Sequence, residues 1–160
     1  MDTISHGLWT YMLTRGYPRR WYVVLGAVFS DFLIIGMALM MFVKGELKIS
    51  APWLPQLYAN PVIPVLDSFA HSLVIWTTVM AAAMFFRIAG LKWFVYGVYF
   101  HILIDIVTHR EFLPGYLFPL SDLTFSGTVD YRTIGFNIVN IVLLSGFAGF
   151  LWYRRRRHNI

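Results

Sequence analysis

The sequence predicts an all-α integral membrane protein: a single bundle of about four transmembrane helices over residues 1–160, with a short amphipathic or re-entrant helix at its N-terminus. Composition is the first reason, since 58% of the residues are hydrophobic and 13% are charged, against about 25% charged residues in soluble domains. The second is a set of four apolar runs, each long enough to cross a bilayer core of ~30 Å. The third is that Lys and Arg gather at the ends of these runs, as they do at membrane boundaries.

Residues 1–15 are expected to form the short N-terminal helix, because apolar side chains recur at helical spacing from Ile4 to Met12. The four predicted spans are residues 21–43, 68–87, 92–108 and 133–153. Four prolines in residues 45–66 favour an extended path over a long helix in that loop. The segment after Thr108 is also expected to be irregular, because it is rich in Pro and Gly.

The basic residues orient the predicted spans. They form three clusters: Arg15, Arg19 and Arg20; Arg87 and Lys92; and Arg154 to Arg157. The clusters alternate along the chain in the way that places all three on one side of the membrane, which is the cytoplasmic side by the positive-inside rule. We therefore expect a multi-pass protein of the inner (plasma) membrane with both termini in the cytoplasm. Because the net charge of +5 resides in these topological clusters, no nucleic-acid partner is expected.

Three residues that can bind a metal ion lie four apart in the third predicted span: His101, Asp105 and His109. At about 100° per residue they fan over only ~80° of one helix face, across about two turns. One helix can therefore offer two ligands to one ion and a third ligand to a neighbour. Ionisable residues inside a membrane are costly and usually functional. The alternative is a structural helix in which the histidines and the aspartate are satisfied by local hydrogen bonds.

The first two predicted spans carry residues of the same kind. Asp67 and His71 repeat the four-residue spacing at the start of the second span, on the side predicted for His109. Asp67 can instead be a helix N-cap at the membrane boundary. Asp31 lies ten residues into the first span, which is roughly 15 Å from its start and near the middle of the bilayer. A carboxylate at that depth needs a partner, either a shared cation or a hydrogen bond to a neighbouring helix.

His6 precedes the first span, so the predicted topology places it on the cytoplasmic side, away from His71 and His109. A re-entrant N-terminal segment would instead bring it to Asp31 and His101. The sequence pattern alone favours the hypothesis that His6 makes only a local hydrogen bond and has no part in the site.

The chain has no cysteine, so any metal must be held by imidazole and carboxylate groups. These ligands suit Zn²⁺ best, with Mn²⁺ and Fe²⁺ as alternatives. A bound metal would activate a water molecule and polarise a phosphoryl oxygen. Either Asp67 or Asp105 can then act as a general base, or orient a ligating imidazole by a hydrogen bond to its second nitrogen.

Several short motifs along the chain form a familiar pattern. They are His6-Gly7, Gly26-Ala-Val-Phe-Ser-Asp31, Asp67-Ser-Phe-Ala-His71-Ser72-Leu73, His101-Ile-Leu-Ile-Asp105 and Phe118-Pro119. Over most of residues 1–125 the pattern resembles the YdjM/YbcI-type family of bacterial and archaeal inner-membrane proteins, described as metal-dependent hydrolases. That family is distantly similar to zinc-dependent phospholipases C and to fungal single-strand nucleases.

The resemblance implies an all-helical zinc site with a defined set of ligands. The implied ligands are His6, Asp31, His71, His101 and Asp105. This sequence departs from the family at two places: Ser30 precedes a single acid at Asp31, where the family usually has an acidic pair around a proline, and Asp67 and Phe69 stand where an arginine or histidine is often found. One or two ions are therefore expected rather than a larger cluster.

These observations predict a membrane-embedded metal-dependent hydrolase that cleaves a phosphoester of a lipid or lipid-linked substrate entering from the membrane. A transporter or relay for protons or divalent cations is the first alternative. It would need polar residues through the cytoplasmic half of the bundle, where the third span has Trp93, Phe94, Val95 and Val98 instead. The second alternative is a non-catalytic membrane partner protein, whose polar residues only join helices.

Overall fold

The computed structural model describes residues 1–48 and 52–158 and confirms the all-α class, since every regular element in these residues is a helix. The helices are α1 (Thr3–Leu13), α2 (Arg20–Val43), α3 (Trp53–Tyr58), α4 (Val62–Ala70), α5 (Leu73–Phe85), α6 (Ala89–Thr108) and α7 (Ile134–His158). By length and hydropathy, α2, α6 and α7 can each cross a membrane. Helices α4 and α5 form a fourth candidate span that is bent by 43°. The predicted membrane bundle is therefore present, with its second span broken.

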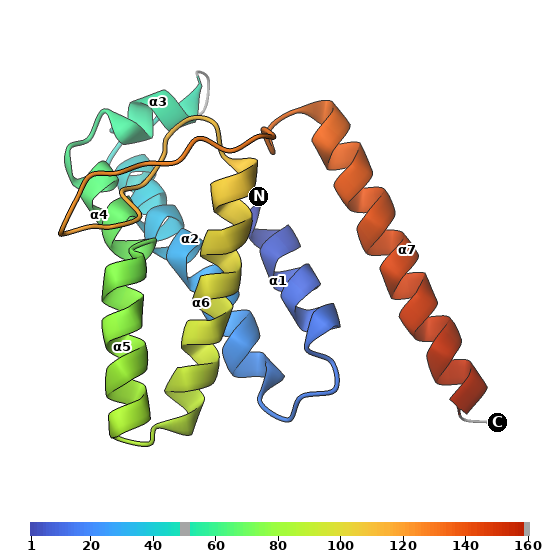
Figure 1. Cartoon of the computed structure of the whole chain (residues 1–160). Helices are drawn as coiled ribbons and strands as arrows, with labels where there is room; N and C mark the ends of the chain where they lie inside the picture. The colour runs from blue at the N-terminus through green and yellow to red at the C-terminus, as the bar shows by residue number, and fades with distance from the viewer. Residues whose placement is uncertain (49–51, 159–160) are drawn as a thin grey trace.

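Helices α2 and α6 form the centre of the bundle and cross where each has a glycine. A Cβ atom on Gly26 would lie 1.9 Å from the Phe94 carbonyl oxygen, and one on Gly97 would lie 1.9 Å from the Val23 carbonyl oxygen. The two backbones are thus in direct contact, as small residues allow in membrane helices. Both helices run in the same direction from this crossing (Figure 1). Asp31 on α2 and His101 on α6 follow one turn later, so the crossing sets their separation.

The break between α4 and α5 places His71 at the turn. Ser72 is the N-cap of α5, and its hydroxyl accepts a hydrogen bond from the Ile75 backbone N–H. The Ala70 carbonyl accepts hydrogen bonds from Ser30 Oγ (3.0 Å) and Trp76 Nε1 (2.7 Å). Backbone groups freed by a break in a membrane helix need partners of this kind. The break is therefore held in place by neighbouring helices.

The expectation of an extended path over residues 45–66 is wrong, because α3 and the first half of α4 lie there. Pro52 and Pro61 are the N-caps of these helices, and Pro55 and Pro64 lie in their first turns. The N–H groups of a first turn have no partner within the helix, so proline costs little there. The number of prolines was thus a poor predictor of the secondary structure here, whereas the positions of the prolines within the helices were informative. The segment from His109 to Thr133 is irregular, as predicted.

Helix α1 folds back along α2 and lies between the α2–α6 pair and α7 (Figure 1). Asn140 of α7 binds it: the Asn140 Oδ1 accepts a hydrogen bond from Trp9 Nε1 (2.9 Å), and its Nδ2 donates to Ser5 Oγ (2.7 Å). The N-terminal segment is therefore re-entrant rather than interfacial. Its start lies at the far end of the bundle from the turn that carries Arg15.

The three basic clusters share one end of the bundle, at the start of α2, the α5–α6 turn and the end of α7 (Figure 1). The Arg15 guanidinium donates to the Leu151 carbonyl there (3.4 Å). Met1, by contrast, lies beside Asp105 near the opposite end. Met1 and the end of α7 therefore lie toward opposite ends of the bundle, because α1 reverses direction before α2, and the side of the membrane on which each terminus lies stays a prediction.

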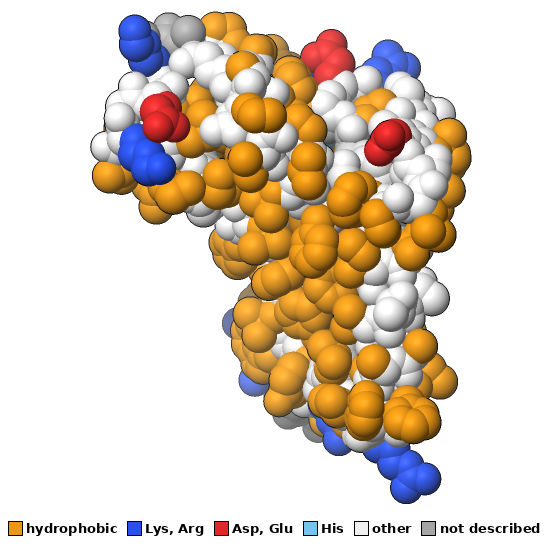
Figure 2. All heavy atoms as spheres, turned by 90° about the vertical axis from the view of Figure 1, so that its left-hand side faces the viewer, with side chains coloured by type: hydrophobic (Ala, Val, Ile, Leu, Met, Phe, Trp, Pro, Cys, Tyr) orange, Lys and Arg blue, Asp and Glu red, His pale blue; other side chains and the backbone are white. Residues whose placement is uncertain are grey.

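The surface has the pattern of a membrane protein. Figure 2 shows one face on which hydrophobic side chains cover the middle, with Asp, Glu, Lys and Arg at one end and Lys and Arg at the other. Large apolar side chains on the outer faces are exposed, for example Phe85 (80%) and Ile134 (79%). Such exposure is stable in lipid but not in water.

Candidate metal centre

Four residues from three parts of the bundle bring potential metal ligands together. One ligand atom from each of Asp31, His71, His101 and Asp105 lies within 4.8 Å of the others. Asp31 comes from α2, His71 from the α4–α5 break, and His101 and Asp105 from one face of α6. His71, His101 and Asp105 are buried, whereas the Asp31 side chain is 20% exposed. The group is a buried candidate metal site with one carboxylate at its open edge.

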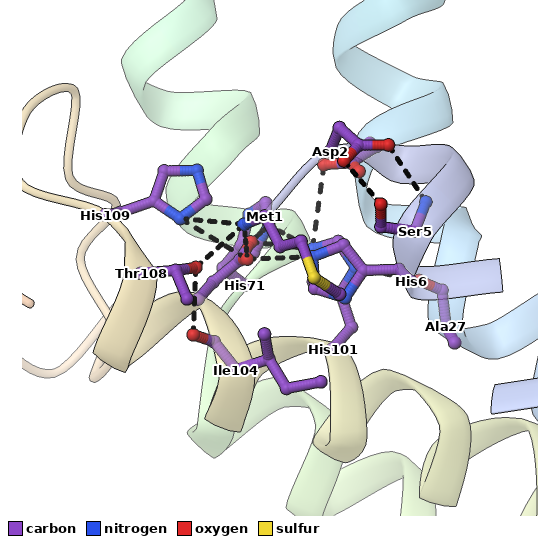
Figure 3. A network of polar contacts seen from close by, with 12 residues as sticks. Met1, Asp2, Ser5, His6, Ala27, His71, His101, Ile104, Thr108 and His109 are labelled. Atoms are coloured by element: carbon purple, nitrogen blue, oxygen red, sulfur yellow. Dashed lines mark hydrogen bonds and ion pairs between the residues drawn. The ribbon is translucent and has the colours of Figure 1, made fainter. Parts of the chain in front are cut away.

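Asp105 is the centre of this arrangement, and its two oxygens face different partners. Oδ2 lies 3.0 Å from His101 Nε2 and 3.8 Å from His71 Nε2. Oδ1 lies 2.8 Å from His6 Nε2 and 3.3 Å from His109 Nδ1. The Met1 amino group also donates to Oδ1, at 2.6 Å. Figure 3 shows these histidines converging from α1, the α4–α5 break and α6.

Hydrogen bonds to backbone carbonyls fix which nitrogen of each imidazole faces the site. His101 Nδ1 lies 2.7 Å from the Ala27 carbonyl oxygen, and His71 Nδ1 lies 2.9 Å from the Asp67 carbonyl oxygen. A carbonyl only accepts, so each Nδ1 must carry a proton. In the neutral imidazoles both Nε2 atoms then present lone pairs, and they lie 3.1 Å apart. At this distance the two nitrogens must share either a proton on one ring or a cation, and the group formed with Asp31 and Asp105 fits a metal ion.

A carboxylate and a tyrosine fix the orientation of the His71 ring through Nδ1, the nitrogen that points away from the site. Asp67 Oδ1 lies 2.9 Å from His71 Nδ1, and Asp67 Oδ2 accepts a hydrogen bond of 2.6 Å from the Tyr58 hydroxyl. Burial and the Asp67 carboxylate raise the pKa of Tyr58, so its hydroxyl remains a donor at neutral pH. A carboxylate that pairs with the outer nitrogen of a ligating histidine is typical of metal sites. Asp67 lies inside α4, so the alternative that it is an N-cap is wrong.

Tyr58→Phe is expected to weaken zinc binding about tenfold, the lower end of the loss seen when an outer partner of a metal ligand is removed. The change leaves one Asp67 oxygen without its donor and loosens the orientation of His71. Competition with a coloured chelator measures the affinity. Tyr17→Phe at the exposed turn before α2 is the matched control and should bind zinc like the wild type. Equal affinities in both variants would show that Tyr58 does not support the site.

A cavity of about 290 Å³ lies over the site. Asp31, His71 and Asp105 line its base, and α3 and the irregular segment after α6 line its rim. On that rim the Arg132 guanidinium donates to the carboxylates of Asp130 (2.8 and 3.1 Å) and Glu111 (3.0 Å). The hydrogen bonds from Arg132 lower the pKa of Asp130 to about 2, so this ion pair persists at any ordinary assay pH.

The structure brings all six predicted ligands to one place. They are His6, Asp31, His71, His101, Asp105 and His109. The placement of His6 away from the others, and its purely local role, are wrong: its ring stacks on His101 with 3.9 Å between the ring centroids. The charge pattern could not show this, because it orients spans and does not detect a helix that dips between them.

The sequence did not predict three residues of the site: Met1, Tyr58 and Thr108. Thr108 Oγ1 accepts a hydrogen bond of 2.8 Å from the Met1 amino group, and Tyr58 supports Asp67. Thr108 adjoins His109 and continues the polar face of α6, which is a signal that could have identified it. Tyr58 lies in a separate helix before Pro61, so helical spacing could not relate it to Asp67. Comparisons of this chain with protein-family models, curated proteins and solved structures found no match.

Proposed function

We propose that the site binds a divalent metal ion, with Zn²⁺ as the preferred ion, and that the protein is a membrane-embedded hydrolase of lipid phosphoesters. The observation that carries the proposal is the pair of buried imidazole Nε2 atoms, from His71 and His101, that lie 3.1 Å apart beside the carboxylates of Asp31 and Asp105. Two nitrogen and two oxygen ligands without thiolate are a set that zinc accepts, and Mn²⁺ or Fe²⁺ are the alternatives. The motif resemblance to the YdjM/YbcI-type family supports the same reading.

The two oxygens of Asp105 suggest where one or two ions would bind. The first position is formed by Oδ2 with Asp31, His71 and His101. The second candidate position is at Oδ1, which His6 Nε2 and His109 Nδ1 both approach, and an ion there would have to displace the Met1 amino group that donates to Oδ1. In this proposal Asp105 is the shared ligand.

A bound zinc ion supplies an activated water and polarises a phosphoryl oxygen. The three aspartates of the site have different roles in this proposal. Asp67 has both oxygens in hydrogen bonds behind His71, so it positions that imidazole rather than acting as a base. Asp105 is buried with both oxygens engaged and suits ligation. Asp31 is partly open to the cavity and is therefore the better proton acceptor.

The shape of the bundle favours a hydrolase over a transport path. Between the site and the basic end, the core is filled by buried apolar side chains, among them Trp76, Met80, Val95 and Val98. The cavity therefore ends at the metal site in the part of the chain that the structure describes. Its lining includes two apolar side chains that are about half exposed, Ile35 on the candidate span α2 and Trp53 on α3. A substrate that arrives through the membrane, such as a lipid with a phosphate group, suits this geometry.

The proposal is tested by phosphate-ester turnover with purified protein in detergent. Bis(p-nitrophenyl) phosphate and phosphatidic acid serve as probes, after zinc loading and after chelation. We expect turnover that disappears on chelation, returns with zinc and is lost in Asp31→Asn. Asp122→Asn, in the exposed loop after α6, is the matched control and should retain it. Zinc-loaded protein without turnover, or turnover unaffected by Asp31→Asn, would refute the hydrolase assignment.

A further inference from the structure

An apolar groove of about 520 Å³ runs along the outside of the bundle between α1 and α2. On the α1 side it is lined by Ile4, Gly7 and Leu8, and on the α2 side by Val24, Val28 and Phe32. Ile4, Leu8 and Phe32 are 75%, 45% and 55% exposed, so the groove is open to the surrounding lipid.

Gly7 keeps this groove open at its floor. A Cβ atom at Gly7 would lie 3.2 Å from Val28 Cγ1, so α1 and α2 approach each other closely at this point. The lining residues of α1 run from Thr3 to Tyr11, which is about 12 Å along the helix. An apolar groove that is open to lipid along this length suits a hydrocarbon chain.

The groove adjoins the cavity over the metal site. Thr3 and Ile35 line both of them. Asp31 lies one turn before Ile35 on α2 and faces the cavity. A second apolar hollow, of about 420 Å³ between α1 and α6, has no lining residue in common with the cavity. Of these two surfaces, the α1–α2 groove is therefore the one that borders the cavity.

We propose that the α1–α2 groove binds the hydrocarbon tail of the substrate while the phosphate lies at the metal site. This assignment rests on the proposed function and adds the tail-binding surface to it. The occupant is a lipid phosphate with a long aliphatic chain, because the groove offers apolar contacts along a lipid-facing surface. The phosphate passes between Thr3 and Ile35, and the chain runs along α1 toward the basic end of the bundle.

Photolabelling tests the proposal without requiring turnover. Zinc-loaded protein in nanodiscs is labelled with hexadecyl phosphate that carries a diazirine midway along its chain, and the labelled peptides are identified by mass spectrometry. Hexadecanol with the same diazirine reports the background labelling of every lipid-facing helix. We expect the phosphate probe to label α1 and α2 several-fold more, relative to the other helices, than the alcohol does.

Two exposed leucines of α1 provide matched variants. Leu8→Trp places a large side chain in the groove and should abolish the excess labelling of α1 and α2 by the phosphate probe. Leu13→Trp changes the same helix at the hollow that lacks a connection to the cavity, and should leave the labelling pattern as in the wild type. Zinc content confirms that each variant keeps its fold.

The outcomes separate this proposal from the hydrolase assignment. Equal labelling patterns for the phosphate and the alcohol would overturn the groove assignment, even if zinc-dependent turnover of bis(p-nitrophenyl) phosphate is present. Excess labelling of α1 and α2 without any such turnover would support the groove and refute the hydrolase. Loss of the excess in both tryptophan variants would also overturn the proposal, because only Leu8 lines the groove.

Discussion

Asp105→Asn is expected to lose stoichiometric zinc and all zinc-dependent turnover. Asp105 is the residue that all the histidines of the site approach, with His101 Nε2 at 3.0 Å and His6 Nε2 at 2.8 Å. An amide keeps the volume but removes the negative charge and one of the two acceptors. Loss of an outer partner alone costs about 10- to 100-fold in metal affinity, so loss of this ligand should cost at least about 100-fold. Competition titration and metal analysis measure the effect.

The matched control for Asp105→Asn is again Asp122→Asn, which makes the same chemical change in an exposed loop. It should bind zinc and turn over phosphate esters like the wild type. If Asp105→Asn retains a full zinc complement with wild-type affinity, the ion does not bind at this cluster. The site would then have to be sought elsewhere in the chain.

Gly26→Ala is expected to lower the free energy of unfolding by about 3 kcal/mol or more, at the upper end of the cost of overpacking. The new Cβ would lie 1.9 Å from the Phe94 carbonyl oxygen, which belongs to the backbone of α6 and cannot rotate away. The helices must separate, and Asp31 then moves away from His101. Thermal unfolding and zinc content should therefore both decrease.

Gly36→Ala makes the same change in the same helix and is the control. Nothing lies within 4 Å of its added Cβ, and alanine is the better helix former by about 1 kcal/mol at most. Its unfolding and zinc content should match or slightly exceed those of the wild type. If Gly26→Ala behaves in the same way, α2 and α6 are not packed backbone to backbone.

Hydropathy and charge predicted the spans well, because a helix that crosses lipid must be long and apolar and carries its basic residues at the membrane boundary. The spans at α2, α6 and α7 begin and end within five residues of the predicted ranges. The break at His71 was not predicted, because its stability comes from Ser30 and Trp76, which hydrogen bond to Ala70 from outside the turn. Tertiary partners of this kind leave no local pattern in the sequence.

The site was predictable where its residues share one helix and unpredictable where they do not. His101 and Asp105 lie four apart on α6, so helical spacing was sufficient to group them. His6 was grouped with them only through a family resemblance, since nothing near it indicates that α1 folds back along α2. The support of Asp67 by Tyr58 likewise depends on how α3 packs, which no spacing rule encodes.

Metal analysis together with X-ray absorption at the zinc edge tests the central claim most directly. The claim is that the buried cluster around Asp105 binds a divalent metal inside the membrane bundle. The account predicts one or two zinc ions per chain, with nitrogen and oxygen neighbours at about 2.0–2.1 Å and the scattering pattern of imidazole. Folded protein that retains no stoichiometric metal after incubation with zinc, or a bound zinc ion without imidazole neighbours, would contradict it.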